Sequence, residues 1–301
     1  METFIDNPNL ALVLDAVYYI AIAFLLFYIG KVFYGLFHPN INMKDELVKK
    51  DNLAFSISTI GYFIGLLFAI GSAIIGPSYG LIDDLIIIAV YGLLSILLLN
   101  LASKVNDHVI LRKFNVEKEI ITDQNPGTGV VEAANYIASG LIILGAVTGE
   151  GKNFFENMMY GYLLSGVITA ISFWAVGQAI LLLTTLFYDA IVPYKVHDHI
   201  EKDNIAVGIG FAGAMIAMAN IIRIGVGGDF VAWDVNFYTL VVDVMIGFAL
   251  LPVVRFLTDK VLLPGEKLTD EIVNQDKPNI GAAMIEAFAY IGGSVVISWV
   301  I

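Results

Sequence analysis

Residues 85–104, LIIIAVYGLLSILLLNLASK, hold no charge until their last position and are long enough to cross a bilayer as a helix. A helix needs about 20 such residues to span a hydrocarbon core of about 30 Å. Seven more stretches meet this requirement, so the sequence predicts eight membrane-spanning helices. The eight lie near Leu12–Phe37, Asn52–Ile75, Leu85–Lys104, Gly129–Val147, Met158–Tyr188, Asn204–Val226, Phe237–Thr258 and Gly281–Ile301.

The composition places the chain among polytopic membrane proteins of the all-α class. Of 301 residues, 58% are hydrophobic and only 15% are charged, and the mean hydropathy is +0.81. The net charge of −12 argues against a nucleic-acid partner, which needs a basic surface. Without cysteine the chain has no disulfide or thiolate metal site. We expect the lipid bilayer to be the principal partner, and we expect no metal or other cofactor.

Positive charges predict the orientation of the helices. Fourteen of the 16 Lys and Arg residues fall in the first, third, fifth and seventh connections or at the helix ends beside them: Lys31, Lys44, Lys49, Lys50, Lys104, Arg112, Lys113, Lys118, Lys195, Lys202, Arg255, Lys260, Lys267 and Lys277. Lys152 and Arg223 lie on or towards the other side. Because cytoplasmic loops retain Lys and Arg, we expect these four long loops to be cytoplasmic and both termini to be outside.

An internal duplication divides the chain into residues 1–152 and 153–301. A shift of 152 residues places Lys50-Asp51-Asn52 on Lys202-Asp203-Asn204 and Asp107 on Asp259. With small indels, Pro39 pairs with Pro193, and Glu132-Ala133-x-x-Tyr136-Ile137 pairs with Glu286-Ala287-x-x-Tyr290-Ile291. Each half then holds four spans, so the halves share one orientation. The duplication predicts two parallel repeats related by a pseudo-two-fold axis along the membrane normal.

These repeated motifs resemble those of the YjfL-like bacterial inner-membrane proteins, known as domain-of-unknown-function family 350 (DUF350). In that family, four-span units occur singly or in tandem. The resemblance rests on Asp51-Asn52 and its copy, on Asp107 and Asp259, on the Leu-Leu-Pro-Gly turn at 262–265, and on the Glu-Ala-x-x-Tyr-Ile motif. The first copy departs from the pattern where Arg112-Lys113 replaces Pro264-Gly265. The resemblance implies a bacterial inner membrane but no activity.

Two groups of residues suggest structural roles. Asp51-Asn52 and Asp203-Asn204 precede the second and sixth spans, where short polar side chains cap helices; an ion entrance is the alternative. Small residues recur every four positions at Gly61, Gly65 and Ala69, and again at Gly213 and Ala217. Such stripes let helices approach closely. They predict packing in the centre of the bundle or at a dimer interface, with a glycine-lined path as the alternative.

The fourth span of each half carries a carboxyl group inside the membrane. Glu132 shares a helix face with Asn135, Tyr136 and Ser139, and Glu286 shares one with Tyr290 and Ser294. A carboxyl in this setting marks a functional site, because burial disfavours its charged form and makes it a proton or cation acceptor. The alternative is a hydrogen bond that joins helices.

A second polar pair is expected in the outer half of the sixth and seventh spans. Arg223 lies near the outer end of the sixth span and Asp243 near the middle of the seventh; a short outer loop connects these spans, and an ion pair between the two residues would offset the cost of their burial. A gate or substrate contact is the alternative. The first half has Gly71 and Tyr91 at these positions, so this feature belongs to one repeat.

The residues support two functional hypotheses. One is a proton- or cation-coupled transporter or an ion-conducting protein that uses Glu132 and Glu286, assembled as a homodimer. The other is a scaffold that recruits a peripheral cytoplasmic protein. No sequence motif of an enzyme is present, so we do not expect catalysis.

Overall fold

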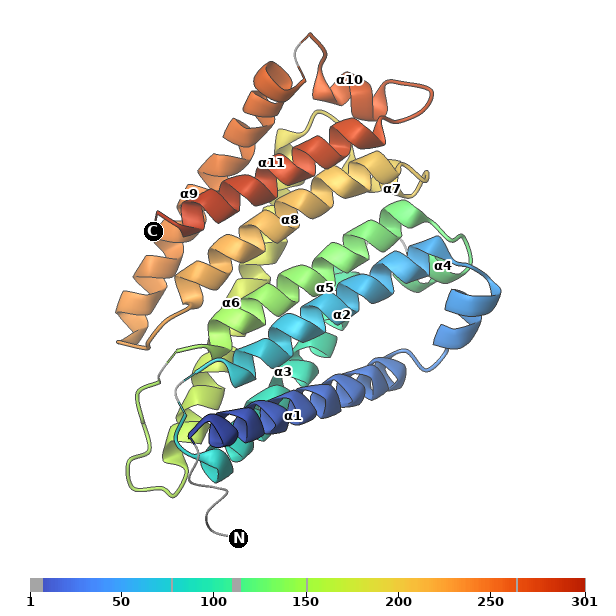
Figure 1. Cartoon of the computed structure of the whole chain (residues 1–301). Helices are drawn as coiled ribbons and strands as arrows, with labels where there is room; N and C mark the ends of the chain where they lie inside the picture. The colour runs from blue at the N-terminus through green and yellow to red at the C-terminus, as the bar shows by residue number, and fades with distance from the viewer. Residues whose placement is uncertain (1–7, 77, 110–114, 150, 264, 301) are drawn as a thin grey trace.

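The computed structural model describes residues 8–76, 78–109, 115–149, 151–263 and 265–300 (Figure 1). Over these residues the chain is helical, and eight of its helices are long and apolar enough to cross a membrane, as predicted. The long helices are α1 (Pro8–Phe37), α2 (Leu53–Ile74), α3 (Leu81–Val109), α5 (Pro126–Val147), α6 (Gly161–Ile191), α8 (Ile205–Val226), α9 (Trp233–Leu257) and α11 (Ile280–Ser298). Arg112, Lys113 and Pro264, which entered the comparison of the repeats, lie outside the described residues.

Short helices fill the connections that the charge pattern singled out. They are the π-helical turn η2 (Asp45–Lys49), α4 (Val116–Ile121), α7 (Val196–Ile200) and α10 (Leu268–Val273), and a second π-helical turn, η3 (Thr258–Leu262), extends α9. In Figure 1, α4, α7 and α10 lie at one end of the bundle. We call this end the short-helix face and the opposite end the far face.

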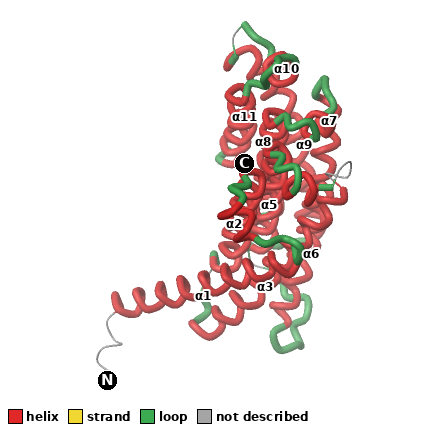
Figure 2. Tube along the Cα trace, turned by 90° about the vertical axis from the view of Figure 1, so that its right-hand side faces the viewer, coloured by secondary structure: helices red, strands yellow, loops and turns green. Residues whose placement is uncertain are grey.

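Four helices make a row through the centre of the molecule. α2, α5, α8 and α11 lie side by side in that order, and each begins at the short-helix face (Figure 1). The other four long helices pack along this row. Figure 2 shows α1 leaving the bundle at an angle. Only 17% of the residues in its most apolar stretch are buried. The row therefore forms the centre of the protein. The helices at the two ends of the row are α2 and α11.

This arrangement contradicts the predicted pseudo-two-fold axis. Such an axis would exchange α2 with α8 and α5 with α11, so the contact between α5 and α8 would require an equal contact between α2 and α11. Instead α2 and α11 lie at opposite ends of the row, with α5 and α8 between them (Figure 1). The repeats share an orientation, as expected, but follow one another along the row.

The small residues hold the row together. A side chain on Gly61 would overlap the backbone of Ala133, and one on Gly65 would overlap the carbonyl of Tyr136. Gly213 approaches Ala287 in the same way in the second repeat. The glycine stripes therefore serve packing inside one chain, because only glycine permits backbones to come this close.

Asparagine side chains cap the row helices and also connect them. Asn52 Oδ1 accepts a hydrogen bond from Phe55 N, which caps α2, and Asn52 Nδ2 donates to the carbonyl of Ile120 in α4 at 2.9 Å. Asn125 caps α5 and donates to Ile200 in α7, and Asn204 caps α8 and donates to Ile272 in α10. Each cap thus reaches the short helix that precedes the next member of the row.

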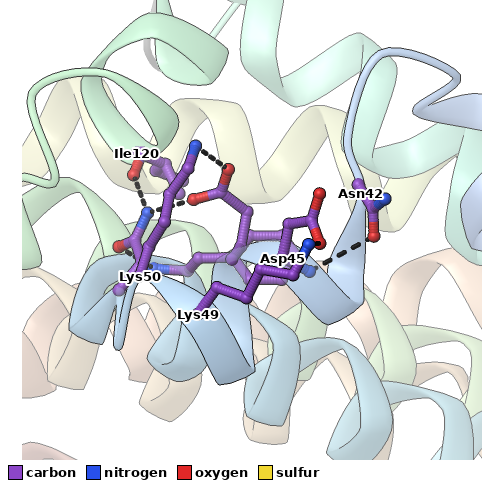
Figure 3. Close-up of polar contacts among 8 residues, drawn as sticks. Asn42, Asp45, Lys49, Lys50 and Ile120 are labelled. Atoms are coloured by element: carbon purple, nitrogen blue, oxygen red, sulfur yellow. Dashed lines mark hydrogen bonds and ion pairs between the residues drawn. The ribbon is translucent and has the colours of Figure 1, made fainter.

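The first of these caps belongs to a small polar cluster on the short-helix face. Glu46 in η2 receives hydrogen bonds from Asn52 Nδ2 at 3.0 Å and from Lys50 Nζ at 2.5 Å. Figure 3 shows Lys50 and Ile120 in this cluster, with Asp45 and Lys49 beside it. The buried Glu46 carboxylate is thereby paired with a positive charge, and each of its oxygens accepts a hydrogen bond. These contacts lower the free-energy cost of burying its charge.

The prediction that Asp51 and Asp203 also act as caps was wrong. Both are exposed and precede the capping asparagine, with left-handed backbones at φ 49° and 61°. Asp and Asn tolerate this conformation better than other residues with side chains do. The aspartates therefore serve the turn into each helix, and the asparagines serve as the caps.

Candidate functional site

Glu132 lies two turns inside α5 and is almost fully buried, with 3% of its surface exposed. Its Oε1 accepts a hydrogen bond from the hydroxyl of Ser103 in α3 at 3.2 Å, and its Oε2 accepts one from Asn135 Nδ2 at 3.4 Å. Within the described residues, no basic side chain forms an ion pair with this carboxyl. The carboxyl of Asp107 also hydrogen-bonds with Glu132, so the partners of Glu132 among the described residues are two neutral groups and a second acid, which stabilise a negative charge weakly.

Three tyrosines surround this carboxyl. Tyr136 is 1% exposed, and its hydroxyl lies 3.0 Å from the Ser103 hydroxyl that also reaches Glu132. The rings of Tyr34 in α1 and Tyr62 in α2 pack against Tyr136, with centroids 6.5 and 5.1 Å away. Residues of α3 and α5 thus bond to Glu132, and α1 and α2 pack against the neighbouring Tyr136.

A network of amides extends from Glu132 to the second repeat. Asn106 Nδ2 in α3 donates to Asn135 Oδ1 at 2.5 Å and to Gln178 Oε1 in α6 at 3.0 Å. Gln178 also contacts the hydroxyl of Ser139 at 3.4 Å. The first carboxyl site is therefore completed by a residue of the second repeat.

Glu132 and Tyr136 form part of the wall of a cavity of about 330 Å³ near the short-helix face. Asp107, Lys104, His38 and Glu117 also line this cavity. Burial lowers the pKa of His38 to about 4; the positive charge of Lys104 lowers it further, and the carbonyl of Tyr34 acts against both. At neutral pH the imidazole is thus uncharged, and the cavity joins Glu132 to a surface of mixed charge.

Glu286 has a different environment. It is 0% exposed, and its Oε1 lies 2.5 Å from Arg255 Nη1. The hydroxyl of Tyr290 donates to the same oxygen at 3.3 Å. Arg255 also donates to Thr269 in α10 and lies 5.7 Å above the ring of Tyr194. A buried ion pair, not a neutral hydrogen-bond network, therefore holds the second carboxyl.

The repeat alignment identifies the origin of this difference. The shift of 152 residues that defines the repeats places Ser103 on Arg255. Each of these residues contacts the glutamate of its own half. Tyr34 and Tyr188 also correspond, after the indel of two residues. The two sites share a plan, and the exchange of Ser103 for Arg255 gives a cationic partner to the second glutamate alone.

The predicted pair of Arg223 and Asp243 is not formed. Arg223 Nε donates to Asn220 Oδ1 at 3.1 Å, and the carboxylate of Asp243 lies against Gly225. In the described part of the chain, no ion pair joins the two residues. Asn220 lies three residues before Arg223, where side chains on one helix face meet, so this contact forms inside α8.

Sequence reasoning missed several residues of these sites, notably Ser103, Asn106 and Arg255. Arg255 counted only as one of the positive charges near a long loop, although η3 extends its helix to Leu262 and leaves Arg255 inside. A comparison of every residue near the glutamates at the same offset would have found the exchange of Ser103 for Arg255.

Comparisons with known proteins agree with the two-repeat plan. The model of the Domain of Unknown Function (DUF350) matches residues 8–147 and again residues 162–301. A UPF0719 transmembrane protein of Aquifex aeolicus (strain VF5) is 21% identical over 267 residues, which cover 88% of this chain and 92% of that protein. No solved structure matches the chain. This chain is an integral membrane protein that belongs to the DUF350 family and carries two tandem copies of its unit.

Proposed function

We propose that this protein moves protons or small cations across a membrane and that Glu132 is the group that accepts them. The observation that carries the proposal is the contrast between the two repeats. Glu132 borders a cavity and contacts Ser103, Asn135 and the Asp107 carboxyl, whereas Glu286 is paired with the guanidinium of Arg255. A carboxyl that must gain and lose a cation needs access and no permanent counter-ion.

The route from Glu132 to the far face alternates between polar and apolar layers. Beyond Tyr136, Asn100 Nδ2 in α3 donates to the Tyr62 hydroxyl at 3.3 Å. Farther on, the hydroxyls of Ser72 and Ser95 lie 3.4 Å apart, and Ser72 lines a cavity that opens at the far face. Leu66, Ala69, Ile96 and Leu99 are fully buried between these polar pairs.

This apolar layer favours a gated carrier over an open pore. Ions do not cross a dry layer of aliphatic side chains without a conformational change. The α2 and α3 helices carry both the polar pairs and the barrier. We therefore expect their relative movement to connect Glu132 with one cavity at a time.

We place the protein in the bacterial inner membrane, with the short-helix face in the cytoplasm and both termini outside. The support is the concentration of Lys and Arg in the connections that form this face. In this orientation Glu132 is reached from the cytoplasm through the 330 Å³ cavity.

Flux in reconstituted vesicles tests the proposal. Purified protein would be placed in vesicles that contain a dye sensitive to protons, sodium or potassium, and the gradient of the same ion would be imposed. We expect wild-type protein to dissipate at least one gradient and Glu132→Gln to reduce that flux to the level of protein-free vesicles. Glu201→Gln, an exposed glutamate on the short-helix face, is the matched control and should keep wild-type flux.

Two outcomes would contradict the proposal. One is the absence of flux by well-folded wild-type protein under all three gradients. The other is full flux in Glu132→Gln. Either result would favour the scaffold hypothesis, in which the short helices bind a peripheral protein.

A further inference from the structure

A second cavity opens at the far face, where the route proposed for Glu132 ends. Its volume is about 1390 Å³. It lies between the repeats, bordered by the ends of α2, α5 and α8 and by the beginnings of α3 and α6. Small-molecule sites usually measure about 300 to 1,000 Å³, so this cavity has room for a sizeable ligand or part of a lipid.

The charged side chains in the described lining of this cavity are all acidic. Asp83, Asp84 and Asp229 contribute carboxylates, and the described residues that line the cavity include no Lys or Arg. Asp84 accepts hydrogen bonds from the Tyr19 hydroxyl at 2.7 Å, from the Ser78 hydroxyl at 2.6 Å and from Tyr79 N at 2.8 Å. Three donors favour the ionised carboxylate and fix its position. The cavity therefore offers a negative potential without movement of this side chain.

Aromatic rings contribute to the wall beside aliphatic and small residues. Seven aromatic residues line the cavity: Tyr19, Tyr79, Tyr91, Tyr160, Tyr162, Phe173 and Phe230. Behind them, the ring of Trp233 lies 5.8 Å from Phe173 and 4.9 Å from Phe230. Aromatic faces attract cations, and they attract organic ammonium ions in particular.

We propose that this cavity binds an organic ammonium ion, with its apolar body against the aromatic rings and its charge towards the aspartates. Carboxylates alone would suit a small inorganic cation, and rings alone would suit a neutral apolar molecule. The combination in one large space suits a ligand with both characters. The same chemistry occurs in free amines and in the headgroup of phosphatidylethanolamine. Although this cavity is also the far-face end of the route proposed for Glu132, binding of the ammonium ion to it is measured directly and does not require flux.

Trp233 allows a direct binding measurement. The chain has three tryptophans, so Trp174→Phe with Trp299→Phe leaves Trp233 as the single reporter beside the cavity. This protein would be placed in phosphatidylglycerol nanodiscs and titrated with benzyltrimethylammonium. Neopentylbenzene, which has the same shape and no charge, is the matched ligand control. We expect saturable fluorescence change with the cation and much weaker binding of the neutral molecule.

Variants test the contributions of the carboxylates and of the open space to binding. Asp83→Asn removes a cavity carboxylate that is exposed and should weaken binding several-fold. Asp234→Asn, at the same face but outside the lining, should leave binding unchanged. Gly151→Phe should also weaken binding, because a Cβ at Gly151 meets only Gly166 Cα, at 3.9 Å, and the added ring would enter the cavity.

A second membrane composition distinguishes the source of the ammonium group. If the cavity takes lipid headgroups, phosphatidylethanolamine nanodiscs should weaken the apparent binding of benzyltrimethylammonium by competition. Equal binding in both nanodiscs would favour a free amine. The proposal is overturned if the cation gives no saturable change in phosphatidylglycerol, if neopentylbenzene binds equally well, or if Asp83→Asn and Gly151→Phe both bind like wild type.

Discussion

Arg255 Nη1 lies 2.5 Å from Glu286 Oε1, at the position where the first repeat has Ser103 beside Glu132. The side chains of both members of this ion pair are shielded from solvent, with 10% and 0% exposed. A buried ion pair costs desolvation of two charges, and it is kept only where both remain together. The duplication thus produced one carboxyl that has a permanent counter-ion and one whose partners among the described residues are Ser103, Asn135 and the Asp107 carboxyl.

Removal of the arginine should destabilise the second repeat. Arg255→Met leaves a buried carboxyl without its partner, and breaking such a pair costs about 3 kcal/mol or more. Thermal unfolding in detergent would measure the loss. The double variant Arg255→Met with Glu286→Gln should recover most of it, since no unpaired charge remains. A single variant as stable as wild type would show that the pair carries no net stability.

Introduction of the arginine should inactivate the first repeat. Ser103→Arg places a guanidinium where it can pair with Glu132, as Arg255 does with Glu286. We expect this variant to lose flux in vesicles while keeping the wild-type elution volume and cooperative unfolding. Ser103→Ala is the control and should retain flux, because it removes one hydrogen bond and adds no charge. Unimpaired flux in a folded Ser103→Arg protein would contradict the role given to Glu132.

The close packing of the row predicts a sharp difference between two glycines of α2. Gly65→Ala should cost about 1 to 3 kcal/mol or more, because its new methyl group would overlap the Tyr136 carbonyl. Gly71→Ala meets nothing within 4 Å and should be neutral or slightly stabilising, as expected for alanine in a helix. Thermal unfolding of both variants in one detergent gives the comparison. Equal effects would mean that the row tolerates a wider spacing than the structure shows.

His38 should make stability depend on pH below neutrality. The folded protein lowers the pKa of His38 from the ordinary 6.5 of an imidazole to about 4, so the unfolded chain binds a proton first as the pH falls. Stability is therefore complete above pH 6.5 and is lost progressively down to pH 4, by about 3 kcal/mol at most. His38→Gln should flatten the slope of the melting temperature over this range. Parallel slopes for the two proteins would rule out this assignment.

The absence of native cysteine makes the orientation easy to test. Single cysteines at Lys49 and Lys195, on the short-helix face, should react with a membrane-impermeant maleimide only after the cells are opened. A cysteine at Asp234, on the far face, should react in intact cells. The reverse pattern would place the short-helix face outside and would contradict the positive-inside interpretation.

The parts of the structure that follow from one-dimensional patterns were predictable. Continuous apolar stretches specify the eight spans, and the offset of 152 residues specifies the repeat. The burial of Glu132 and Glu286 followed from their depth along α5 and α11. These features depend on length and periodicity, which the sequence displays directly.

Features that depend on contacts between distant helices were harder to predict. Arg223 and Asp243 were paired by proximity along the chain, but rotation of the helices turns Asp243 towards Gly225 and leaves Arg223 with Asn220. Asn125 did not stand out because its motif differs from that around Asn52, although both residues cap a row helix and reach the next short helix. Only the packed row makes their equivalence visible.

The order of the row has a consequence for how such chains assemble. The repeats meet through unlike surfaces, α5 of one and α8 of the next, which is a heterologous, head-to-tail junction. A junction of this type leaves one unsatisfied surface at each end, and α11 indeed exposes Met284 and Phe288 while α2 exposes Ile60 and Leu67. In this chain both units belong to one polypeptide, so the junction forms within the molecule. Two chains with a single unit each would have to associate to form the same junction. A further chain added in the same way would lengthen the series of units instead of closing it.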